Sequence, residues 1–181
     1  MTPDLNPEIS DPPAPGEPLD ERVDHVRGQG GSPVILEYGD YECPYSRQAF
    51  RAIERVEREL SGRVRFVFRH FPLIRIHPHA LAAAAAAEAA AGQGLFWEMH
   101  GLLFHRQRAL EDHNLRSYAN ELGLKVAHFD RDRVGPEVRA RIARDVESGE
   151  ATGVHGTPTL FIDGLLHEGS YDAEALLEAL R

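Results

Sequence analysis

The chain has 181 residues, 42% of them hydrophobic, which is enough for one core of ordinary domain size. Its 29 acidic and 20 basic side chains give a formal net charge of -9, which repels phosphate backbones and anionic lipids, so nucleic acid and membranes are not expected partners. No apolar run approaches the roughly 20 residues of a membrane span, no secretory signal begins the chain, and a single cysteine excludes an internal disulfide, so we expect a cytoplasmic protein.

The first segment, residues 1–27, is rich in proline and acidic side chains. Such a composition cannot bury enough apolar area to offset the entropy of the chain. We therefore predict a disordered tail over residues 1–27, followed by one domain over residues 28–181.

Residues 33–38 form an apolar, β-rich run that predicts a buried strand. A helix should begin at Pro44 and end at Ser61-Gly62, because its apolar residues recur at helical spacing and make one face. Residues 64–68 are typical of a second strand. A strand-helix-strand unit implies that the two strands pair in parallel.

The pattern then becomes helical, with helices expected over residues 78–91, 96–108, 115–122 and 136–148. Strand character returns after this block, and the final elements are expected to be a strand at 159–162, a turn at Asp163-Gly164, a strand at 165–168 and a helix at 173–180. The order βαβ, helices, ββα predicts an α/β domain with a helical insertion over about residues 75–150.

Cys43 lies between the first strand and the first helix, with Pro44 in the first helical turn, where proline is best tolerated. The unpaired amide donors and the dipole of a helix amino terminus favour an anion. This position therefore favours the thiolate form of Cys43, whereas a cysteine without such a setting is usually an inert core residue.

Several short motifs occur in a specific order. They are Glu37-Tyr38-Gly39-Asp40-Tyr41-Glu42-Cys43-Pro44-Tyr45-Ser46, Arg69-His70-Phe71-Pro72-Leu73, His77-Pro78, Phe96-Trp97-Glu98-Met99-His100, Leu103-Phe104 and Gly156-Thr157-Pro158-Thr159. In this order they resemble the DsbA-like thioredoxin-fold family from about residue 24 to the end. The resemblance implies a thioredoxin fold, βαβ and ββα, with an inserted helical subdomain.

The same resemblance implies a thiol-disulfide exchange site with Cys43 as the nucleophile. Thr157 and Pro158, joined by a cis bond, would face the thiol and bind the extended backbone of a partner. The other residues expected to bind substrate are Pro44, Tyr45 and His155. A cationic His155 near the thiol would also favour the thiolate.

Two further residues are implied to take part in catalysis. Glu37 matches the acidic side chain that the family places beneath its cysteines as a proton acceptor; the alternative is a strand residue that points to water. Ser46 stands where most relatives have a second cysteine, and its hydroxyl can donate a hydrogen bond to the Cys43 thiolate. Because a hydroxyl cannot expel a bound partner as a second thiol does, we expect a monothiol protein whose mixed disulfides persist until an external thiol resolves them.

The chain has ten histidines, including His70, His77 and His79, but no His, Cys and carboxylate spacing matches a known metal site. We therefore predict no metal and no tightly bound cofactor. Glutathione or another low-molecular-weight thiol is the expected co-substrate, and the expected partners are protein or small-molecule thiols and disulfides.

The first hypothesis for the function is a monothiol thiol-disulfide oxidoreductase. Two alternatives remain open. One is a glutathione-dependent enzyme similar to kappa-class glutathione transferases and 2-hydroxychromene-2-carboxylate isomerases, in which Ser46 would activate the bound thiol. The other is a redox-inactive binding or chaperone module that uses the helical insertion as a groove.

Overall fold

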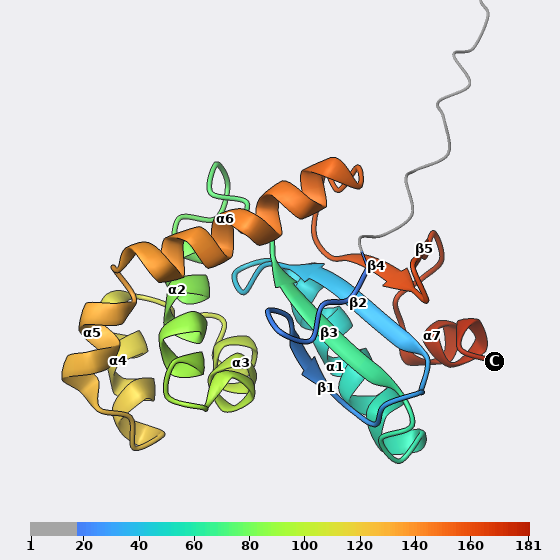
Figure 1. Cartoon of the computed structure of the whole chain (residues 1–181), viewed down its shortest axis with the longest axis horizontal. Helices are drawn as coiled ribbons and strands as arrows, with labels where there is room; N and C mark the ends of the chain where they lie inside the picture. The colour runs from blue at the N-terminus through green and yellow to red at the C-terminus, as the bar shows by residue number, and fades with distance from the viewer. Residues whose placement is uncertain (1–17) are drawn as a thin grey trace, which may run out of the picture.

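The computed structural model describes residues 18–181 (Figure 1). Five strands form one sheet in the order β1-β3-β2-β4-β5. They are β1 (His25–Arg27), β2 (Val34–Gly39), β3 (Arg65–His70), β4 (Thr159–Ile162) and β5 (Leu165–Leu166). The pair β2 and β3 is parallel, as the crossover helix predicted, and the other neighbours are antiparallel.

The two faces of the sheet bury different parts of β2, because successive side chains of a strand point to opposite sides. Ile35 packs in the larger core with α1 (Pro44–Glu59) and α7 (Ala173–Ala179). Leu36 and Tyr38 pack in a second core on the other face, against the region of Val146. Each large apolar side chain buried in this way stabilises the fold by about 1.5–3 kcal/mol.

A block of helices separates β3 from β4, and within residues 18–181 it contains no strand. The helices are α2 (Ala80–Ala91), α3 (Phe96–His105), α4 (Asp112–Glu121), α5 (Val126–Asp132) and α6 (Pro136–Ala151). The alanine-rich α2 contacts α3, α5 and α6, since alanine combines high helix propensity with close packing. Figure 1 shows α6 running from this block back over the sheet. No helix among the described residues is long and apolar enough to cross a membrane.

The predicted fold class is thus confirmed, an α/β domain with a helical insertion, but three details of the prediction were wrong. The helix α5 was missed, and several element ends differ by one to three residues from those expected. The predicted disordered tail, residues 1–27, extends too far along the chain, because residues 25–27 form strand β1 at the edge of the sheet. The remainder of the predicted tail, residues 1–17, lies outside the described residues.

Asp24 explains why the amino-terminal segment is ordered at that point. Its carboxylate is buried and accepts hydrogen bonds from the guanidinium of Arg69, at 3.0 and 2.8 Å. The same guanidinium donates to Tyr38 and Ser148, so residues before β1 are joined to the sheet and to α6. A buried ion pair with further hydrogen bonds orders its surroundings although the segment is poor in apolar residues.

Candidate active site around Cys43

Cys43 is the N-cap residue of α1, with extended backbone angles of φ -74° and ψ 121°. Its side chain is nearly buried, with 3% of the residue exposed, and its Sγ donates to the backbone oxygen of Thr157 at 3.2 Å. The peptide bond between Thr157 and Pro158 is cis. The fold therefore brings together the two segments that the sequence placed at one site, although they are separated by 114 residues.

The backbone around the cysteine is held by a side chain that the sequence did not single out. The amide of Gln107 donates to the carbonyl oxygens of Tyr41 and Cys43, each at 2.8 Å. Cys43 N in turn donates to Asp40 O at 3.1 Å. Gln107 lies in the helical insertion, and nothing in its local sequence indicates this long-range contact.

Ser46 lies in the first turn of α1 and is fully buried. Its Oγ accepts a hydrogen bond from the backbone N–H of Asp40 at 3.2 Å. Within the described residues, the hydrogen bond of Ser46 is therefore with the loop before the helix rather than with the Cys43 sulfur, which differs from the expected arrangement.

Glu37 lies on β2 and is fully buried, so the alternative of a side chain that points to water is wrong. Neither of its carboxylate oxygens has a hydrogen-bond partner among the described residues. Because burial disfavours the charged form, the pKa of Glu37 is raised to about 8. Glu37 lies between Leu36 and Tyr38 in the strand, so its side chain points to the opposite face of the sheet, which is the face covered by α1. The carboxyl therefore gains or loses a proton close to neutral pH.

Two carboxylates tie the loop after β3 to the active-site segment. Asp40 Oδ2 accepts from Leu73 N at 2.9 Å and from His77 Nδ1 at 2.7 Å. Glu42 accepts from His79, through the backbone N–H at 2.6 Å and through Nδ1 at 2.8 Å. These two histidines thus hold the position of a loop beside Cys43.

The residues expected to bind substrate lie at different depths. Pro44 and Tyr45 are exposed, and Tyr45 keeps 57% of its surface. Tyr171, which sequence reasoning missed, lies beside them: burial raises its pKa, and the nearby Tyr45 and Cys43 raise it further. His155 is exposed, and no described hydrogen bond joins it to Cys43.

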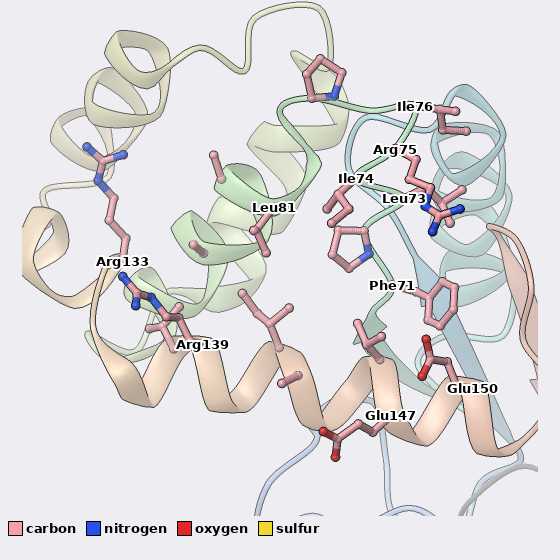
Figure 2. Close-up of a pocket in the computed structure, with 18 of the residues that line it drawn as sticks. Phe71, Leu73, Ile74, Arg75, Ile76, Leu81, Arg133, Arg139, Glu147 and Glu150 are labelled. Atoms are coloured by element: carbon pink, nitrogen blue, oxygen red, sulfur yellow. The ribbon is translucent and has the colours of Figure 1, made fainter.

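His155 is one of the residues that line a groove of about 1020 Å³ between the 71–78 loop, α2 and α6. Figure 2 shows aliphatic side chains along this groove, among them Ile74 and Leu81. In the same view Arg133 and Arg139 lie toward one end of α6, and Glu147 and Glu150 lie toward the other. The groove is therefore lined mainly by apolar side chains, with arginines at one end and, toward the other, the two glutamates together with Arg75.

Comparisons with known proteins agree with this arrangement. A family model described as "Thioredoxin" matches residues 20–181. A thioredoxin-like oxidoreductase from Silicibacter pomeroyi DSS-3 is 28% identical, with 87% of this chain and 90% of that chain covered and a TM-score of 0.78. BdbD from Bacillus subtilis is 19% identical, with 94% and 97% covered and a TM-score of 0.81, and it shows the fold alone.

Curated relatives add a different observation. The chain is 44% identical over 164 residues to the Na(+)/H(+) antiporter NhaA 1 of Salinispora arenicola, which covers 90% of this chain and 25% of that protein. It is 42% identical over 168 residues to the Na(+)/H(+) antiporter NhaA of Herminiimonas arsenicoxydans, which covers 91% of this chain and 27% of that protein. The chain thus spans about a quarter of the length of these relatives.

Proposed function

Because the chain belongs to the thioredoxin family, in its DsbA-like form, we propose that it is a thiol-disulfide oxidoreductase that acts through the single thiol of Cys43. One observation carries the proposal: Cys43 caps a helix and faces the cis Thr157–Pro158 bond, while Ser46 lies three residues later in the first turn of that helix. The chain has one cysteine, so no internal disulfide can complete the reaction.

The proposed reaction has two exchange steps. The Cys43 thiolate attacks one sulfur of a partner disulfide, so that a bond from Sγ to that sulfur forms, the partner's S–S bond breaks, and the other sulfur leaves as a thiolate that takes up a proton. A low-molecular-weight thiol, deprotonated as it reacts, then attacks the partner's sulfur in the mixed disulfide. Cys43 leaves as a thiolate, and the partner is now joined to the small thiol. Exchange leaves the total number of disulfides unchanged.

Four other residues take supporting roles in this proposal. Glu37 serves as the buried proton acceptor, since its pKa of about 8 lets it exchange a proton near neutral pH. The backbone of Thr157 pairs with an extended partner. The exposed side chains of Pro44 and Tyr45 contact that partner beside Cys43. Because Cys43 is nearly buried, a partner sulfur must approach it from the side of Pro44 and Tyr45.

The alternative of a glutathione-dependent transferase or isomerase requires Ser46 to touch the bound thiol. The full burial of Ser46 and its hydrogen bond with Asp40 count against that role and favour the first hypothesis. The binding-module alternative draws on the apolar groove instead of on Cys43. The curated relatives are named as Na(+)/H(+) antiporters, but their chains are about four times as long as this one. We do not propose ion transport for this chain.

Replacement of Cys43 tests the proposal directly. We expect Cys43→Ala to abolish glutathione-dependent reduction of a small mixed disulfide, and we expect the matched variant Ser46→Ala to retain it, since the serine is not a resolving group. Activity that survives in Cys43→Ala but not in Ser46→Ala would support the transferase alternative. Absence of activity in the unaltered protein and in both variants would favour the binding module.

A further inference from the structure

A cluster of metal-ligating side chains lies outside the site around Cys43. Within residues 18–181, His25, His70 and Glu88 are the one group of three such residues whose ligand atoms all lie within 4.8 Å of one another. His25 Nε2 and His70 Nε2 are each 2.7 Å from the same oxygen, Glu88 Oε1. We propose that these three side chains form a binding site for a divalent transition-metal ion of the zinc type.

The ligands come from three elements that the fold fixes relative to one another. His25 opens β1 and pairs with Phe68 of β3, so that it lies diagonally across the ladder from His70 on the same face of the sheet. Glu88 comes from α2, whose buried alanines share the larger core with Phe68 of β3. Because both imidazoles and the carboxylate sit on regular elements, their convergence is set by the fold and not by a mobile loop.

The donor set matches the chemistry of zinc. Two imidazole nitrogens and one carboxylate oxygen are ligands that Zn²⁺ prefers, whereas Mg²⁺ and Ca²⁺ are bound by oxygen. In a tetrahedral site with bonds of about 2.0–2.1 Å, ligand atoms lie about 3.3 Å apart. The two contacts of 2.7 Å need to lengthen by roughly half an ångström, which rotation of the Glu88 side chain can supply. A fourth position remains for water.

The charge of the cluster also favours a cation. Glu88 is buried, and its Oε1 lies 2.7 Å from both His25 Nε2 and His70 Nε2. The carboxylate lies in an aromatic surrounding, where Phe96 stacks on the His25 ring with a centroid separation of 3.5 Å. A buried anion of this kind needs a partner charge, which either a proton on an imidazole or a bound metal ion supplies.

The cluster has one open side. The side chain of His25 is 17% exposed, that of Glu88 7%, and that of His70 1%. An ion can therefore enter past His25 while the other two ligands stay covered. The spacing along the sequence did not predict this site, because His25 and Glu88 are 63 residues apart.

The test is a metal titration of the full chain after treatment with a chelator. We expect one Zn²⁺ per chain in competition with a chromogenic chelator, and Co²⁺ should give visible d–d absorption without a thiolate charge-transfer band. His25→Ala and Glu88→Gln should each weaken the affinity by at least about tenfold. The exposed His113→Ala and the thiol variant Cys43→Ala should bind as the unaltered protein does.

Folding of the variants is checked by circular dichroism and by the reaction of Cys43 with oxidised glutathione, which does not involve the metal. Added Zn²⁺ should raise the melting temperature of the unaltered protein and not that of His25→Ala, because an ion that binds only the folded state stabilises it. The proposal is overturned if no stoichiometric binding occurs, if folded His25→Ala binds as tightly as the unaltered protein, or if Cys43→Ala is the variant that loses the metal.

Discussion

Glu37 makes the stability of the domain depend on pH in a way that one substitution removes. In the folded state its pKa is raised from 4.5 to about 8, because the carboxyl is fully buried and has no hydrogen-bond partner among residues 18–181. The folded protein therefore holds a proton that the unfolded chain releases between these values. The contribution to stability is fully present below about pH 4.5 and is lost as the pH rises toward 8.

The magnitude follows from the two pKa values. Raising the pH from 5 to 8 should reduce the free energy of unfolding by about 3–4 kcal/mol, because the folded protein gradually loses the Glu37 proton that stabilises it. Glu37→Gln keeps the shape and stays neutral, so this variant should lose that share of the pH dependence and be clearly more stable than the unaltered protein at pH 8.

Urea unfolding of both proteins at the two pH values measures the effect. Subtracting the change in unfolding free energy of Glu37→Gln from that of the unaltered protein cancels the contributions of all other titrating groups. The exposed Glu98→Gln is the matched control and should follow the unaltered protein. If Glu37→Gln keeps the same pH dependence within about 1 kcal/mol, the carboxyl is not the buried neutral group described above.

Three other substitutions test the packing around the site. Asp24→Asn removes the buried carboxylate that accepts from the Arg69 guanidinium and should cost about 3–5 kcal/mol in urea unfolding; a loss below about 1 kcal/mol would mean that this segment is not anchored. In Gly39→Ala the added methyl lies 2.4 Å from Phe68 Cε2, so a cost of about 1–3 kcal/mol is expected, and unchanged stability would show that the ring moves freely. Asp40→Asn should lower the free energy of unfolding by about 1.5–3 kcal/mol and speed alkylation of Cys43 by iodoacetamide. An alkylation rate equal to that of the unaltered protein would show that Asp40 does not position the loop beside the thiol.

The sequence predicted the elements whose pattern is local. Both central strands, the helix after Cys43 and the final strand and helix have clear apolar periodicity, and the structure has them within a few residues of the expected ends. By contrast β1 is three residues long and polar at both ends, and α5 buries Phe129 alone, so neither shows a repeating apolar pattern.

The contacts of the candidate site likewise fall into those that the sequence predicted and those that it did not. The segments of Cys43 and Thr157 could be paired because the resemblance placed them together, and the structure joins them by one hydrogen bond. The contacts of Gln107 and the convergence of His25 with Glu88 depend on how the helical insertion packs on the sheet. Such contacts arise from tertiary packing between distant segments, so no spacing in the sequence indicates them.

The most direct test of the account is the intact mass of the protein after exposure to oxidised glutathione and removal of the excess reagent. We expect the unaltered protein to retain one glutathione on Cys43 until a reductant is added, because no internal thiol can displace it. In Ser46→Cys the adduct should instead collapse to an internal disulfide with release of glutathione. If the unaltered protein forms no adduct, or if Ser46→Cys retains glutathione as firmly, Cys43 is not the exchange centre and the binding-module hypothesis becomes the better one.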